Sequence, residues 1–138
     1  MRLSMAFVFL AGVLFCAWVA WAAPDGESDQ MISKVQQEMF DAAEKAYDAS
    51  AAVYEVGANG VTLEGVYTWS RRWADAAPKG EQLRAYTAHR DRMKNLLDNV
   101  KVKFDKGVAG GTKDRYEAAR YYAAEADFLL LKITSNTK

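Results

Sequence analysis

Apolar residues recur along this chain at the spacing of α-helices. Over residues 32–56 they alternate in steps of three and four, a heptad seam whose period β-strands do not have. Similar seams cover 83–104, where only Arg90 is polar, and 116–133, and a shorter stripe covers 66–77. The pattern therefore predicts four amphipathic helices. The seam positions are Ile32, Val35, Met39, Ala42, Ala46, Ala49, Val53 and Val56; Leu83, Tyr86, Arg90, Met93, Leu97, Val100 and Phe104; and Tyr116, Ala119, Ala123, Ala126, Leu130 and Ile133.

Two glycine-rich stretches with the same internal pattern interrupt the seams. In Tyr54–Thr62, and again in Phe104–Thr112, an aromatic residue is followed by Gly three and six residues later and by Thr eight residues later. Glycine just past a helix adopts the left-handed conformation at little cost, and threonine is a favoured N-cap. The repeat therefore predicts two helix–turn–helix units, residues 30–77 and 78–134.

The predicted fold is all-α, with two αα-hairpin repeats forming an elongated antiparallel four-helix bundle. Pro78 should begin the third helix, because proline suits the first helical position. The alternative is that Pro78 only kinks one long central helix, which would leave three helices.

Residues 1–22 have the features of a secretory signal peptide: a positive start, an apolar run and small residues before the cleavage point. We therefore expect a mature single domain, residues 23–138, in the periplasm or secreted, with no membrane span after signal removal. The alternative is an inner-membrane anchor formed by uncleaved residues 3–22, because the run approaches the ~20 residues that a span needs. Cys16 is the only cysteine, so the mature chain should contain no disulfide and no thiolate metal site.

The charge balance and the motifs exclude several classes of function. The chain has 18 Lys and Arg against 18 Asp and Glu, which argues against a nucleic-acid or anionic-membrane partner. The acidic residues are spread singly, and neither a phosphate-binding loop nor a haem-attachment motif is present. One histidine falls short of a zinc site. We expect no enzymatic activity, no catalytic residue, no metal and no cofactor.

The stretch YTWSRRW is the most distinctive local motif. Trp69 and Trp73 share a helix face, and Arg71 and Arg72 lie between them. Trp and Arg dominate the hot spots of protein interfaces, so this stretch is a candidate partner-binding patch. The alternative is that both indoles fill the bundle core while the arginines stack on them.

The only histidine, His89, lies four residues before Met93 on one helix face. With Tyr122 these two residues are candidates for lining a small-molecule site between helices. The alternative is a partly buried, hydrogen-bonded His89 that titrates at about pH 6 to 7 and gives a pH response.

Two segments resemble the periplasmic helical-hairpin repeat of TolC-type outer-membrane efflux channels: VYEVGANGVTLEGVYTWSRRWADA and KFDKGVAGGTKDRYEAARYYAAEADFLL. The resemblance covers most of residues 40–131, and it implies a helical tip that meets an adaptor protein. The chain departs from the family in having no barrel strands, one hairpin pair and Leu63 where the first unit's acid would stand, so it should not form a channel by itself. The chain also resembles short secreted bacterial helical proteins of unassigned function that carry W-S-R-R-W/L, A-H-x-x-R-M-K and Y-Y-x-A-E-A. The matches to the efflux repeat are Tyr54, Gly57 and Thr62, and Phe104, Gly107, Thr112, Asp114, Ala118 and Glu125.

Three functions are therefore expected from the sequence. The first is an exported non-enzymatic protein that acts by protein–protein contacts in the cell envelope, beside an efflux or secretion system. The second is a periplasmic small-molecule or metal-binding bundle, and the third is a self-assembling structural coiled coil. For the first function, the expected partner-binding residues outside the Trp–Arg stretch are Gly57, Gly60, Thr62, Gly107, Gly110 and Thr112.

Overall fold

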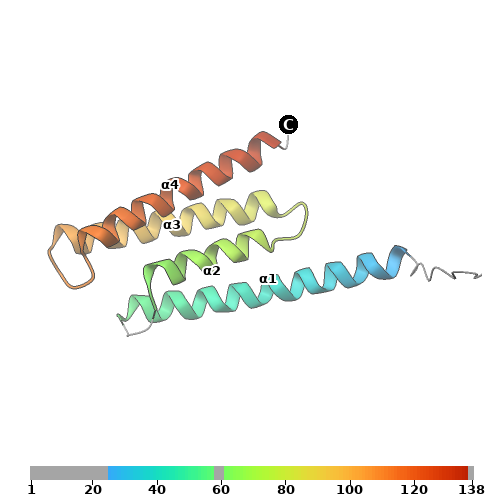
Figure 1. The fold of residues 1–138 in the computed structure, drawn as a ribbon, viewed down its shortest axis with the longest axis horizontal. Helices are drawn as coiled ribbons and strands as arrows, with labels where there is room; N and C mark the ends of the chain where they lie inside the picture. Colours follow the sequence, from blue (N-terminus) through green and yellow to red (C-terminus); the bar gives the residue numbers. More distant parts are fainter. Residues whose placement is uncertain (1–24, 58–60, 137–138) are drawn as a thin grey trace, which may run out of the picture.

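The computed structural model describes residues 25–57 and 61–136, and this part of the chain is helical without a strand. Successive helices run antiparallel, with α1 packed on α2, α2 on α3 and α3 on α4 (Figure 1). A smaller contact joins α2 to α4. The predicted all-α arrangement of two hairpins is confirmed. The helices are α1 (Asp25–Glu55), α2 (Leu63–Asp75), α3 (Gln82–Asp105) and α4 (Lys113–Asn136).

α1 and α3 end on the same side of the molecule (Figure 1), and Gly57 and Gly107 each follow two residues after the last helical residue. Gly57 and Gly107 have φ of +67° and +64°, the left-handed conformation that glycine adopts cheaply. Each glycine N–H donates to the carbonyl of the aromatic residue three positions earlier, at 3.1 Å for Tyr54 and 3.0 Å for Phe104. Thr62 then caps α2, because its Oγ1 accepts from the Gly65 N–H at 3.1 Å. The first glycine of each repeat therefore follows its helix with the same left-handed conformation and the same hydrogen bond.

Pro78 lies in the connection between α2 and α3, so both expectations for this residue are wrong. The third helix begins at Gln82 and not at Pro78, and α2 has already ended at Asp75. The Pro78 carbonyl instead accepts from the Glu81 N–H at 2.9 Å, and Gly80 reverses the chain with φ of +102°. Proline has no N–H to donate within a helix, so Pro78 fits the segment that separates the two hairpins.

The main core lies between α2, α3 and α4. Val66, Met93 and Val100 are almost completely buried, and the alanines of α4 let that helix approach α3 closely. The seam predicted for α4 is confirmed at its centre. The seam of α3 is confirmed at Tyr86, Met93 and Val100, whereas Leu83 and Phe104 at its two ends are exposed. The buried cluster consists of Leu63, Val66, Met93, Leu96, Val100, Ala119, Ala123 and Ala126.

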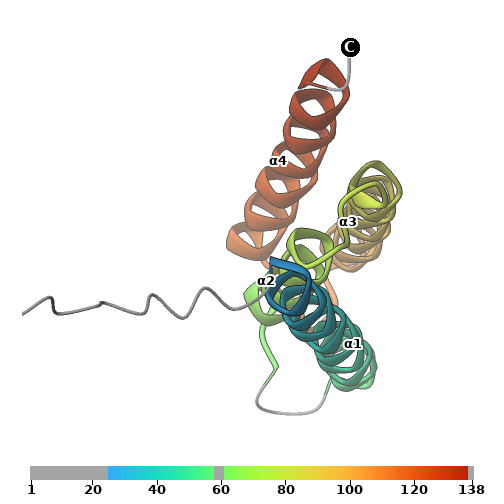
Figure 2. The ribbon, with the colours of Figure 1, turned by 90° about the vertical axis from the view of Figure 1, so that its right-hand side faces the viewer.

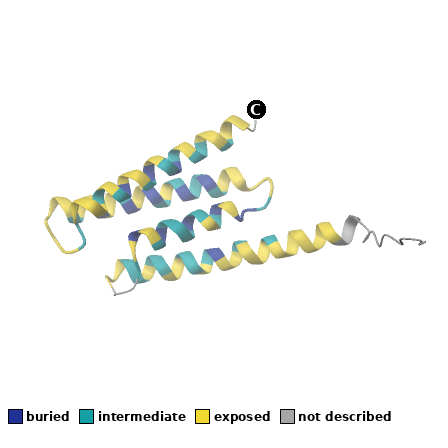
Figure 3. Ribbon diagram, in the orientation of Figure 1, coloured by how far each residue is buried: buried dark blue, intermediate teal, exposed yellow. Residues whose placement is uncertain are grey.

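The seam predicted for α1 is wrong as an intramolecular contact, because α1 packs on α2 with a neighbouring face. Trp73 of α2 lies against Phe40 and Tyr47, with ring centroids 5.9 and 5.8 Å away. Aromatic side chains bury more area than the valines and alanines of the predicted seam. Figure 3 shows the consequence: from residue 28 to residue 39, where burial is described, α1 is largely exposed. Figure 2 shows that α4 lies on the far side of α2 from α1, so it does not cover this surface.

Candidate functional site

A buried polar cluster joins α2 to α3. Ser70 and His89 are both completely buried. The Arg92 Nη1 donates to Ser70 Oγ at 3.1 Å, and Ser70 Oγ lies 2.9 Å from His89 Nδ1. Because the serine oxygen accepts from Arg92, its hydroxyl proton is available to the imidazole Nδ1. The imidazole proton then belongs on Nε2, which is buried and has no hydrogen-bond partner among the described residues.

The environment of His89 disfavours its charged form. Burial, followed by the nearby cations Arg71 and Arg92, lowers the pKa of His89 from 6.5 to about 4. The expected hydrogen bond of His89 is confirmed, but the expectations of partial burial and of titration near neutral pH are wrong. The imidazole is neutral at physiological pH and acts as a hydrogen-bonding part of the interior.

Arg92 connects three helices. Its guanidinium carbon lies 3.7 Å from the ring centroid of Trp73 on α2 and 4.9 Å from that of Tyr47 on α1. A cation that lies against two aromatic rings is attracted to both of them. The side chain therefore ties α3 to α1, although their backbones do not run alongside one another.

The Trp–Arg stretch divides between the interior and the surface. Trp73 is half-buried under Arg92, and Arg71 pairs with Asp75 at 3.0 Å. Trp69 is half-buried, and the exposed Arg72 stacks on it with its guanidinium carbon 4.8 Å from the ring centroid. The second pair is thus the part of the stretch that faces solvent.

The three predicted ligand-lining residues lie around one aromatic group. The ring of Tyr67 is 5.9 Å from that of His89, and it is stacked on Tyr122 at 4.2 Å. Met93 fills the adjacent core. Tyr67 also donates a hydrogen bond to Glu125, and burial together with this bond raises the pKa of Tyr67 to about 12.

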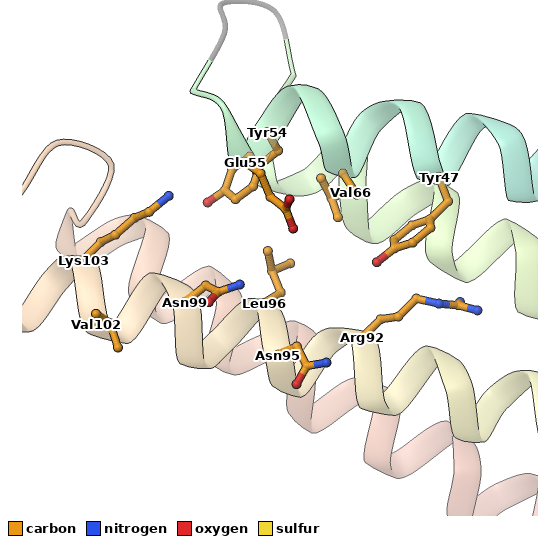
Figure 4. Close-up of a pocket in the computed structure, with 11 residues that line it drawn as sticks. Tyr47, Tyr54, Glu55, Val66, Arg92, Asn95, Leu96, Asn99, Val102 and Lys103 are labelled. Atoms are coloured by element: carbon orange, nitrogen blue, oxygen red, sulfur yellow. The ribbon is translucent and has the colours of Figure 1, made fainter.

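A groove between α1 and α3 has a cavity volume of about 520 Å³ (Figure 4). Its floor is apolar, formed by Val66 and Leu96. On α3, Asn95 and Asn99 lie four residues apart, and their side chains make no hydrogen bond to any residue that the structure describes. The sequence did not predict this groove, because its walls belong mainly to α1 and α3, which are not consecutive in the chain. The lining residues are Tyr47, Ala51, Tyr54, Glu55, Val66, Arg92, Asn95, Leu96, Asn99, Val102 and Lys103.

The opposite side of α1 is an exposed apolar surface. Its four largest side chains are exposed by 49% to 67%. Met39 and Ala42 border a shallow depression whose other wall includes Trp69 and Arg72 of α2. We call this surface the α1 outer face, defined as Met31, Ile32, Val35, Met39, Ala42, Ala46 and Ala49.

The predicted tip residues lie at the two turns. Gly57, Thr62, Gly107 and Thr112 are exposed, and Gly110 is half-buried. Gly60 lies outside the described residues, as does the predicted signal peptide. The two hairpins meet near these turns, where Lys103 Nζ lies 5.4 Å from the ring centroid of Tyr54.

A comparison of the chain with protein-family models, curated proteins and solved structures gives no match. The resemblance to the TolC-type hairpin repeat therefore stays a prediction from the sequence. Among the described residues, no helix is long and apolar enough to cross a bilayer. Within the same residues, no group of three or more His, Cys, Asp or Glu side chains is placed to hold a metal ion.

Proposed function

We propose that this protein is a non-enzymatic helical protein that acts by protein–protein contacts in the cell envelope, made through the α1 outer face. The observation that carries the proposal is the exposure of Met31, Ile32, Val35 and Met39, which are 67%, 60%, 49% and 59% exposed. Single exposed apolar residues are ordinary, but a contiguous apolar surface is typical of an interaction site.

The spacing of the outer face indicates which kind of element it binds. Ile32, Val35, Met39 and Ala42 follow the heptad pattern, which another helix recognises by laying its own apolar side chains between them. Trp69 and its stacked Arg72 stand beside this face and extend it onto α2. Tryptophan and arginine are the residue types that contribute most to interface energies.

The envelope location rests on the predicted signal peptide, and an association with an efflux or secretion system rests on the resemblance of the hairpin repeat. Under this proposal the glycine turns at Gly57 and Gly107 are a second contact surface, at one end of the molecule. The outer face is the larger apolar surface, so its loss should have the larger effect on binding.

The test is affinity capture of the tagged protein from envelope extract, with untagged copies of the chain also present. The double variant Ile32→Ser and Val35→Ser should lose a protein that the wild type retains. Phe128→Ser is the matched control, because Phe128 is 63% exposed on α4 and lies outside the outer face. Equal recovery with all three proteins, or recovery of nothing by the wild type, would refute the proposal.

The groove between α1 and α3 favours a second candidate function, the binding of a small amphipathic anion. Its apolar floor suits a ring or alkyl body, whereas Lys103 and the free amides of Asn95 and Asn99 suit a polar head. Tyr54 adds a buried hydroxyl without a hydrogen-bond partner among the described residues.

The probe for this candidate is 8-anilino-1-naphthalenesulfonate, an aromatic sulfonate whose fluorescence rises in apolar sites. Ala51→Trp places a large side chain in the groove and should abolish saturable binding to the native protein. Ala124→Trp, on the exposed side of α4, should leave binding unchanged. Equal binding by both variants would assign the probe to another surface and end this candidate.

A further inference from the structure

The α1 outer face is divided by residue size. Its N-terminal half presents large side chains, including Ile32, Val35 and Met39, and its C-terminal half presents Ala42, Ala46 and Ala49. Of the alanines, Ala42 and Ala49 are exposed and Ala46 is half-buried.

Because of this division, the outer face is complementary to the same face of a second copy when the two helices run antiparallel. If Met39 of one copy lies opposite Ala42 of the other, each step along one helix is matched by the same step in reverse along its partner. Val35 then lies opposite Ala46, four residues further along each helix, and Ile32 lies opposite Ala49, three further along. Every layer pairs a large side chain with an alanine, which lets the helices approach closely without overpacking or voids.

A parallel pairing does not have this complementarity. It would set Ile32 against Ile32 and Met39 against Met39 at one end of the seam. At the other end, alanine would face alanine and leave unfilled space, which costs stability. The order of large and small residues therefore selects the antiparallel direction.

The charges beside the seam select the same register. Glu38 directly precedes Met39, and Lys45 lies three residues after Ala42, on the same edge of the outer face. In the antiparallel register Glu38 of each copy lies next to Lys45 of the other, where opposite charges stabilise pairing. Both residues are exposed, and neither forms an ion pair with another described residue of its own chain.

The rest of the molecule leaves room for this pairing. The side of α1 that carries Tyr47 and Ala51 faces the groove toward α3, so α3 lies away from the outer face. Trp69 and Arg72 border the face on its α2 side, where they would flank the incoming helix.

We propose that two copies of this protein associate through antiparallel pairing of their α1 outer faces, with Glu38 of each copy beside Lys45 of the other. This inference rests on the proposed function and identifies the partner as the chain itself. The two-fold symmetry makes each contact occur twice, as in most homodimers.

The test measures the mass of the purified protein by sedimentation equilibrium over a concentration series at low salt. The wild type should form a dimer, and Glu38→Lys and Lys45→Glu should each weaken it about tenfold, because two like-charge contacts replace two opposite-charge ones. The double variant E38K/K45E should recover wild-type affinity, and an equimolar mixture of the two single variants should associate more tightly than either alone. Asp98→Lys, a charge reversal at an exposed position of α3, is the control and should leave the dimer unchanged.

Three results would overturn the inference. A wild type that stays monomeric at every concentration would exclude the dimer. A dimer that the double variant fails to restore would exclude this register. A monomer that captures a protein of different sequence, and loses it with I32S/V35S, would refute the inference while leaving the proposed function intact. A wild type that neither dimerises nor captures another protein would refute both the inference and the proposed function.

Discussion

Replacing the buried histidine should change how stability depends on pH. His89 Nδ1 accepts from Ser70, and burial beside two arginines lowers its pKa from 6.5 to about 4. As the pH falls, the unfolded chain therefore takes up a proton before the folded protein does. The contribution of His89 to stability is complete above about pH 6.5 and is lost progressively as the pH falls to about 4.

The size of this effect follows from the difference in proton affinity. A tenfold change in proton affinity corresponds to about 1.4 kcal/mol, so the lowered pKa implies a loss of about 3 kcal/mol between neutral pH and pH 4. That is a large share of the ~5 to 15 kcal/mol that stabilises a typical domain. Carboxylates titrate over part of the same range, so the histidine contribution must be measured as a difference.

The assay is urea unfolding followed by circular dichroism at several pH values from 4 to 7.5, for the wild type and His89→Asn. Asparagine keeps an oxygen that can accept from Ser70, but it does not titrate. The variant should be less stable at neutral pH, because it leaves space in the core. Its stability should fall by about 3 kcal/mol less than that of the wild type on acidification.

Because the chain has only one histidine, its imidazole resonances report the folded-state pKa directly by NMR. A midpoint near 6.5 in the folded protein would refute the reasoning. So would parallel pH profiles of stability for the wild type and His89→Asn, since they would show that the proton affinity of His89 is the same in both states.

Four further substitutions test the second glycine turn, helix α2 and the α1 pairing. Gly111→Ala should destabilise by about 2 kcal/mol or more, because a Cβ there would lie 2.2 Å from the Lys103 carbonyl carbon. Gly65→Ala, with its nearest contact at 3.6 Å inside α2, should instead stabilise by roughly 0.5 to 1 kcal/mol, and equal melting temperatures for the two variants would contradict this contrast. Under mild oxidation, the double variant Val35→Cys and Ala46→Cys should give a disulfide-linked dimer on a non-reducing gel. Ala46→Cys alone should not, because its two copies would lie about 16 Å apart along the helix axis in this register; efficient cross-linking by A46C would indicate another alignment.

Sequence patterns predicted the turns and the contact of α3 with α4 because both depend on residues close in the chain. The left-handed conformation of Gly57 and Gly107 follows from local conformational preference. The alanines of α4 form one face of small side chains, which lets that helix pack closely on α3. The cluster of Ser70, His89 and Arg92 depends on how α2 and α3 are rotated about their axes. No local spacing encodes that rotation, so the burial of His89 was underestimated.

The heptad seam of α1 was identified correctly as a helix-packing pattern, but the sequence alone did not say which helix it packs on. A hairpin partner takes the face that buries most area, and Phe40, Tyr47 and Tyr54 on the adjacent side of α1 outweigh a seam in which three of the eight residues are alanine. A closed bundle would have used the remaining seam to contact α4, but α4 packs on α3 and α2 instead. The regular seam therefore stays largely exposed after the chain has folded, and its division into a half with large side chains and a half with alanines has no role within one copy. Pairing between copies gives that division a physical role, so the intramolecular error and the proposed dimer have the same origin.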